Sequence, residues 1–139
     1  MELSSVGRLH YSQEDGQYRL VVEVDQGLSD YYRALIPKWI AVNKPRWPAH
    51  ITVVRPYKET PVNLEHWGKY EGELVTFEYE NYLHTGKVYF WLNVFCKRLE
   101  EIRAELGLPV SSEFTRPPTG FLKCFHMTVA NCKGTNESV

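Results

Sequence analysis

One short pattern occurs once in each half of the chain, and it limits the possible folds more than any other feature. The segments HITVV (50–54) and HMTVA (126–130) each place a threonine two positions after a histidine, among apolar and β-branched residues. Such residues are typical of strands. Because alternate side chains of a strand point to the same face, each segment predicts a strand with His and Thr on one face and apolar side chains on the other.

The remaining sequence predicts the same order of elements around each pattern: strands, a helix, a loop and then the His-x-Thr strand. Ser29 is the expected N-cap of the first helix, Gly107 the expected stop after the second, and HTG at 84–86 the expected hairpin turn of the second half. The other expected segments are strands at 7–12, 18–25, 73–83 and 87–95 and helices at 28–36 and 96–108.

The bulk properties of the chain suit one globular domain spanning 1–139, with two pseudo-symmetric halves. A formal net charge of −1 argues against broad, non-specific binding to nucleic acid or to an anionic membrane. Three cysteines without a short repeated spacing are a poor disulfide framework, which favours a reducing compartment. The start of the chain lacks the apolar core of a signal peptide, and no run approaches the roughly 18 apolar residues of a membrane span. We therefore expect a cytoplasmic protein with no membrane contact.

A His-x-Thr strand has a chemical use as well as a structural one. Its imidazole and hydroxyl lie about 7 Å apart along the backbone, a span that can hold one tetrahedral anion. If the two patterns face each other, His50 and His126 lie on opposite sides of one phosphate. One neutral imidazole then takes a proton from the attacking oxygen, and the other, protonated, gives a proton to the leaving oxygen. Both forms are available because the ordinary pKa of imidazole is about 6.5, and the pair needs neither a metal ion nor another cofactor.

Positive charge gathers near both patterns in a chain that is almost neutral, which fits a small polyanion bound in a cleft. Arg46 and Arg55 are the preferred phosphate ligands near the first pattern, because a guanidinium binds phosphate through two parallel hydrogen bonds. Lys123 is the candidate near the second pattern. Arg55 follows His50 at an odd spacing, so an ideal strand would point it to the opposite face.

Two aromatic residues lie in the loops that lead into the two patterns. Trp47 precedes the first and Phe121 the second. Nucleobases stack on such rings with roughly 1–3 kcal/mol each. We expect these two rings to contact a base, and we expect most of the other aromatic side chains to lie in the core.

Other residues of similar chemistry are weaker candidates for a functional role. His10-Tyr11-Ser12 also fits the pattern, but it runs into a turn rather than an apolar strand. Cys124 should share the face of His126 and could act as a nucleophile or a metal ligand, yet no Cys-x-x-Cys or His-x-x-x-His spacing accompanies it, and a small buried residue is the simpler explanation. His66 and His84 fall in expected loops or turns and receive no role. The two main patterns themselves could be strand histidines with satisfied hydrogen bonds.

The two patterns together resemble the signature of the 2H phosphoesterase superfamily, in which His-x-Thr/Ser followed by an apolar residue occurs twice. The resemblance covers the two motifs, their separation and the order of elements, and it extends to the cyclic phosphodiesterase-like members. It implies a bilobal α+β fold in which two antiparallel sheets line a central cleft with the helices outside. It also implies that His50 and His126 are the acid/base pair, and that Thr52 and Thr128 hold the phosphate.

The function implied by the resemblance is metal-independent cleavage of a nucleotide phosphodiester. The substrate is either a 2′,3′-cyclic phosphate or a linkage in a short or cyclic oligonucleotide. The superfamily includes compact viral members that destroy cyclic oligonucleotide signals of host immunity, and the small size of this chain resembles theirs. Two alternatives stay open: a non-catalytic module of the same fold that binds a nucleotide or an RNA end, and a structural or interaction protein with coincidental motifs.

Overall fold

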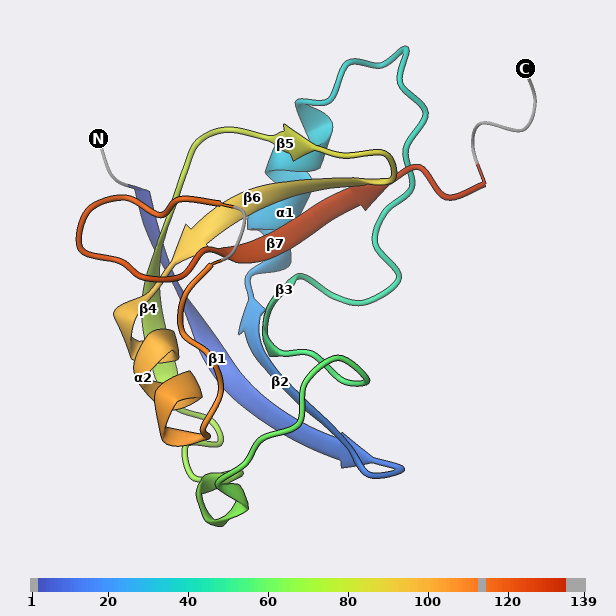
Figure 1. Cartoon of the computed structure of the whole chain (residues 1–139). Coiled ribbons are helices and arrows are strands. Elements are labelled where there is room, and N and C mark those ends of the chain that lie inside the picture. Colours follow the sequence, from blue (N-terminus) through green and yellow to red (C-terminus); the bar gives the residue numbers. More distant parts are fainter. Residues whose placement is uncertain (1–2, 113–114, 135–139) are drawn as a thin grey trace.

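The computed structural model describes residues 3–112 and 115–134 and shows an α+β protein built on a mostly antiparallel sheet (Figure 1). Within these residues, seven strands form one hydrogen-bonded sheet, and two α-helices and a short 3-10 helix accompany it. The strands are β1 (Leu3–Glu14), β2 (Gln17–Val24), β3 (His50–Val54), β4 (Leu74–Tyr79), β5 (His84–Thr85), β6 (Tyr89–Phe95) and β7 (Phe125–Asn131). The helices are α1 (Gln26–Ala34), the 3-10 helix η1 (Leu64–His66) and α2 (Lys97–Glu105).

The first hairpin agrees with its prediction, although β1 begins before the expected segment. β1 and β2 pair in an unbroken antiparallel register from Gly7↔Val24 to Glu14↔Gln17. The connecting residues Asp15 and Gly16 both have positive φ angles, 51° and 73°. This is the backbone that a tight two-residue hairpin turn requires, and Asp-Gly is one of its preferred sequences.

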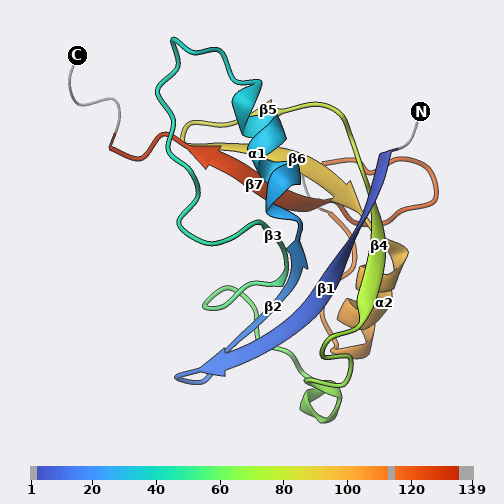
Figure 2. The ribbon, with the colours of Figure 1, turned by 180° about the vertical axis from the view of Figure 1, so that it is seen from behind.

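The expectation of two separate sheets differs from the structure, because hydrogen bonding joins all the described strands in the order β3-β2-β1-β4-β6-β5, with β7 also paired to β6. The joint between the two halves of the chain is narrow. β4 and β6 pair only through Glu78↔Phe95 and Tyr79↔Val94. The sheet curls until it is nearly closed, so that β3 and β7 lie next to each other (Figures 1 and 2).

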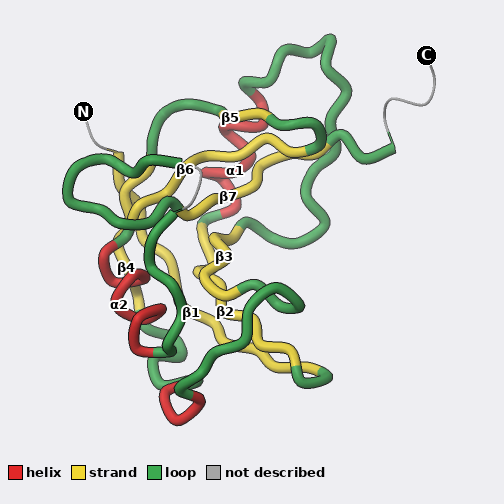
Figure 3. The backbone as a smooth tube through the Cα atoms, in the orientation of Figure 1, coloured by secondary structure: helices red, strands yellow, loops and turns green. Residues whose placement is uncertain are grey.

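The second half of the chain forms its hairpin later than expected. β4 ends at Tyr79, and the chain returns to the sheet at β5, where His84 pairs with Trp91 and Thr85 with Phe90 of β6. Two of the three HTG residues are therefore in a strand, and the turn follows them, closed by a hydrogen bond from the Gly86 N–H to the Tyr89 carbonyl (3.0 Å). Figure 3 shows the loop that connects β4 to β5.

The two helices occupy the expected regions, with one correction at an end. The side chain of Asp25 accepts a hydrogen bond from the Gly27 N–H (3.2 Å) and caps α1, so Ser29 is not the N-cap but lies buried inside the helix. Gly107 ends the region of α2 with a φ of 79°, as predicted. No helix among residues 3–112 and 115–134 has the length and apolar character needed to cross a membrane.

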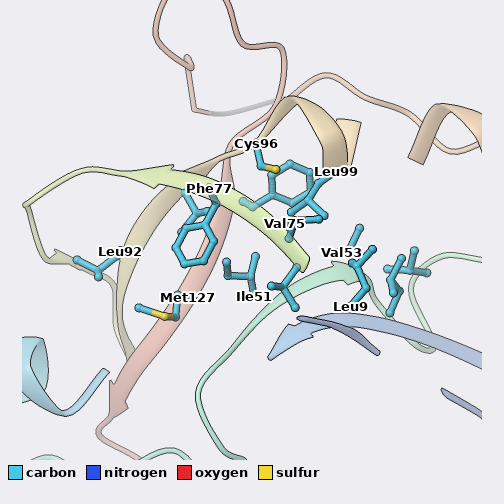
Figure 4. Packing of buried hydrophobic residues seen from close by; sticks show 14 of the residues in the cluster. Leu9, Ile51, Val53, Val75, Phe77, Leu92, Cys96, Leu99 and Met127 are labelled. Atoms are coloured by element: carbon cyan, nitrogen blue, oxygen red, sulfur yellow. The ribbon is translucent and has the colours of Figure 1, made fainter. Parts of the chain in front are cut away.

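The apolar sides of the two His-x-Thr strands face the core. Ile51 and Val53 of β3 and Met127 of β7 are at most 1% exposed and pack together with side chains of β1, β4, β6 and α2 (Figure 4). Strand alternation then turns the residues between them away from this core. The polar side chains of both motifs are therefore presented on the opposite side of β3 and β7.

Candidate functional site

The predicted alternation holds in both motifs. His50 and Thr52 are partly exposed on either side of the buried Ile51. His126 is exposed and Thr128 partly exposed on either side of the buried Met127. Each motif thus offers its imidazole and hydroxyl on the face that points away from the core.

The structure brings three of the four motif side chains into one cavity of about 540 Å³. Thr52 from β3 and His126 and Thr128 from β7 all line it, although they lie in different halves of the chain. Two cations that were also predicted, Arg55 and Lys123, line the same cavity. The cavity therefore combines hydroxyl donors, an imidazole and positive charge, which is a set of groups that suits an anion.

His50 is not one of the residues that line this cavity, and its hydrogen bonds fix its protonation. Its Nδ1 lies 2.7 Å from the Pro48 carbonyl oxygen, and its Nε2 lies 3.4 Å from a guanidinium nitrogen of Arg19. A carbonyl only accepts and a guanidinium only donates, so Nδ1 carries the proton and Nε2 is the free base. Burial lowers the pKa of His50, the hydrogen bond to Pro48 partly offsets this, and the charge of Arg19 lowers the pKa further.

His126 has a different environment. Partial burial of its ring lowers its pKa, and the positive charges of Lys123, His84 and Arg55 lower the pKa further. Two of these charges, Arg55 and Lys123, line the cavity with it. An anion bound in the cavity would offset their effect and raise the pKa of His126.

Arg55 points into the cavity rather than to the opposite face, which corrects the prediction from ideal strand geometry. β3 ends at Val54, so alternation no longer applies to the next residue. The Arg55 backbone N–H donates to Glu59 Oε2 (3.0 Å), and its guanidinium lies 3.8 Å from Glu59 Oε1. Glu59 thus holds the segment that carries Arg55 at the cavity.

A buried ion pair, which the sequence did not reveal, forms part of the cavity wall. Arg103 of α2 is 2% exposed; it donates to Glu59 Oε1 (2.8 Å) and Oε2 (3.0 Å) and to the Val53 carbonyl (2.7 Å). Burial alone would raise the pKa of Glu59, but the hydrogen bonds from Arg103 and from the Arg55 N–H outweigh it and leave that pKa below its usual value. The pair ties α2 to the end of β3 at the cavity.

Lys123 is the second cation of the cavity. Burial lowers its pKa, as do the charges of Arg103 and Arg55, while Glu59 acts in the opposite direction. The backbone before β7 is held by Glu100, whose Oε2 accepts from the N–H groups of Leu122 (2.8 Å) and Lys123 (3.1 Å).

Three other predicted binding residues lie outside the cavity lining. The ring of Phe121 packs against Phe95, with 5.6 Å between the centroids. Trp47 is 56% exposed, and the guanidinium carbons of Arg46 and Arg19 lie 5.3 and 5.7 Å from its ring centroid. Trp47 and Arg46 therefore gather with Arg19 on the side of His50, and their contact with a substrate stays a prediction.

Sequence reasoning missed a group of side chains next to His126. In the β6–β7 register, Asn93 lies opposite His126 and Trp91 lies opposite Thr128. The ring of Trp91 is 5.5 Å from that of His126, and His84 stacks near Trp91 at 5.9 Å with an interplanar angle of 18°. Asn93 is 3% exposed, donates to His84 Nε2 (2.9 Å) and accepts from Trp91 Nε1 (3.1 Å). The sequence feature that could have revealed this group is Asn93, an amide inside an otherwise apolar strand.

The other candidates have structural explanations. Burial raises the pKa of Cys124 to about 11, so its thiolate is disfavoured near neutral pH, which argues against a cysteine nucleophile. His10 on β1 contacts Glu71 through Nδ1 (3.1 Å) and does not line the cavity. Within the described ranges, no three side chains of His, Cys, Asp or Glu are grouped closely enough to hold a metal ion.

Comparisons with family models, curated proteins and solved structures gave no significant match for this chain.

Proposed function

We propose that this chain is a metal-independent phosphodiesterase of the 2H type that cleaves a nucleotide phosphodiester. One observation carries the proposal: Thr52, His126 and Thr128, from two distant motifs of the same pattern, line one cavity together with the cations Arg55, Arg103 and Lys123. Two unrelated motifs would have no reason to bring both of their hydroxyls and one imidazole to the same cavity. The bilobal arrangement of the family is supported by the narrow β4–β6 joint, which leaves one motif on each side.

Different cavity side chains contribute different interactions to phosphate binding. The hydroxyls of Thr52 and Thr128 donate to non-bridging oxygens, and Arg55 and Lys123 supply positive charge. Negative charge builds up on these oxygens in the transition state. Donors that are already fixed in place stabilise that charge without having to reorganise, which is the main way such a site accelerates the reaction.

The hydrogen bonds of His50 make it the general base. Its free Nε2 takes the proton of the attacking hydroxyl as the new phosphorus–oxygen bond forms, after the Arg19 guanidinium has moved off Nε2 on substrate binding. His126, protonated once the phosphate offsets the neighbouring charges, gives its proton to the leaving oxygen as the other phosphorus–oxygen bond breaks. Attack by water gives a monoester, and attack by a ribose 2′-hydroxyl gives a cyclic phosphate.

The substrate class follows from the size and charge of the site. A cavity of about 540 Å³ is large enough for a nucleotide but not for a folded nucleic acid. We propose a 2′,3′-cyclic phosphate or a short or cyclic oligonucleotide as substrate. Degradation of a cyclic oligonucleotide immune signal by a compact viral enzyme of the cytoplasm is one such role.

The direct test is turnover against cyclic phosphates and short linear and cyclic oligonucleotides, with a chelator present and products read by mass spectrometry. His50→Ala and His126→Ala should each lower the rate by about 10²–10⁴-fold, because each removes one proton transfer. His66→Ala, a histidine outside the cavity lining, is the matched control and should leave the rate unchanged. Equal rates in all four proteins would contradict two-histidine catalysis.

A second candidate, a non-catalytic nucleotide-binding module, is favoured by one observation. His50 lies outside the cavity lining, and Arg19 already contacts the nitrogen that a base would use. A binder would release every substrate of the panel unchanged, and its affinity would survive His50→Ala. Measuring binding and turnover on the same panel separates the two functions.

A further inference from the structure

Two guanidinium groups lie near the ring of Trp47, and one of them also contacts His50. The guanidinium carbons of Arg19 and Arg46 lie 5.7 and 5.3 Å from the ring centroid, within the range of a cation–π contact. Arg19 comes from β2, whereas Arg46 and Trp47 come from the loop before β3. Segments that are distant in the chain therefore converge on one exposed ring.

Within residues 3–112 and 115–134, neither cation of this cluster has a neutralising partner. No carboxylate of the described residues forms an ion pair with Arg19 or Arg46, whereas Arg33, Arg98 and Arg103 are each paired with one. Two unpaired positive charges held on the same ring repel each other. A bound anion would relieve that repulsion, and a phosphate can accept hydrogen bonds from both guanidinium groups.

The cluster lies next to the catalytic face rather than on a separate surface. In the β2–β3 register, Val21 lies opposite Thr52 and Glu23 opposite His50, so by alternation Arg19 projects from the face that carries both motif residues. Its guanidinium reaches His50 Nε2 at 3.4 Å. Thr52, two residues after His50, lines the cavity. His50 thus contacts Arg19 of the cluster and shares its strand face with Thr52 of the cavity.

We propose that Arg19, Arg46 and Trp47 form a second phosphate subsite, which binds the phosphate one nucleotide away from the one that is cleaved. This inference rests on the proposed phosphodiesterase function and narrows its substrate. The preferred ligand is a linear or cyclic oligonucleotide with at least two phosphates, and a cyclic mononucleotide would leave the cluster empty. Trp47 acts here as the support that fixes the two guanidinium groups.

The test compares two probes on the His126→Ala protein, which prevents cleavage: adenosine 3′-monophosphate, with one phosphate, and the dinucleotide ApAp, with two. ApAp should bind about tenfold more tightly or better, because one more charged group is paired. Arg46→Gln should remove most of this advantage and leave the affinity for the monophosphate unchanged. It should also reduce the slope of log affinity against log salt concentration for ApAp by about 0.7, the loss of one phosphate contact.

Lys97→Gln, which removes an exposed charge at the start of α2, is the matched control and should preserve the preference for ApAp. Arg19→Gln should act like Arg46→Gln in binding.

Equal affinity for the two probes, or an equal loss in Arg46→Gln and Lys97→Gln, would overturn the second subsite even if the wild-type protein cleaves phosphodiesters. A preference for ApAp that depends on Arg46 in a protein without turnover would keep the subsite and reject the enzyme. Absence of binding to both probes would reject both proposals.

Discussion

At the scale of single residues, the two motif histidines are equal in sequence but not in environment. His50 has its proton fixed on Nδ1 by the Pro48 carbonyl, which leaves Nε2 basic. His126 stands among positive charges that disfavour its protonated form until an anion arrives. In the proposed mechanism, the division between base and acid is therefore set by neighbours that the motifs themselves do not contain.

The lowered pKa values of His50 and His126 predict how stability depends on pH. Both side chains take up protons more readily in the unfolded chain, so the free energy of unfolding should be level above pH 7 and fall as the pH drops below about 6.5. Urea unfolding at a series of pH values measures this. Replacing both histidines by Gln should flatten the fall in the free energy of unfolding. Inorganic phosphate should make that fall smaller in the wild-type protein, because it binds the folded state. An identical pH profile in the variant would contradict the assigned shifts.

At the scale of elements, the β6–β7 pair supports the second motif from the side. Trp91 contacts the ring of His126, and His84 stacks near Trp91. Asn93 joins them with two hydrogen bonds and also donates to Glu80 Oε1 (3.2 Å). The strand pairing thus places, beside the imidazole of the second motif, side chains that do not themselves line the cavity.

This arrangement predicts the effect of changing Trp91. Trp91→Leu should lower turnover on the order of tenfold or more, because the imidazole loses its lateral support. The pKa of His126 should rise as its ring becomes better hydrated, and NMR titration of its ring protons in the absence of substrate measures that rise. Trp91→Phe should retain most of both properties. Trp39→Leu, at a tryptophan that is 85% exposed, is the control, and an equal effect there would reject the supporting role.

At the scale of the whole molecule, local patterns predicted much of the fold. The β1–β2 hairpin, both His-x-Thr strands and α2 follow from alternation, turn residues and helical spacing. The features that were missed depend on contacts between distant segments: the single sheet, the place of β5 and the pairing of Arg103 with Glu59. Arg55, named as a phosphate ligand, does line the cavity, although ideal strand alternation would have pointed it away, because the end of β3 and not its period decides its position.

In the candidate site, too, local patterns were predictable and contacts between distant segments were not. The motif residues were predictable because each motif carries its own His and Thr at strand spacing. Arg19, Trp91 and Asn93 were not, because only the strand register brings them beside the two histidines. Thr52 lines the same cavity as His126 and Thr128 only because the sheet curls until β3 and β7 are neighbours.

The central claim is that both imidazoles act on one bound phosphorus. The most direct measurement is a crystal structure with an uncleavable phosphorothioate dinucleotide. The account predicts one phosphorus held by Thr52 and Thr128, with His50 Nε2 and His126 each within about 2.6–3.2 Å of oxygens on opposite sides of it. A phosphate held by the threonines while His50 stays bound to Arg19, out of reach of any phosphate oxygen, would contradict it.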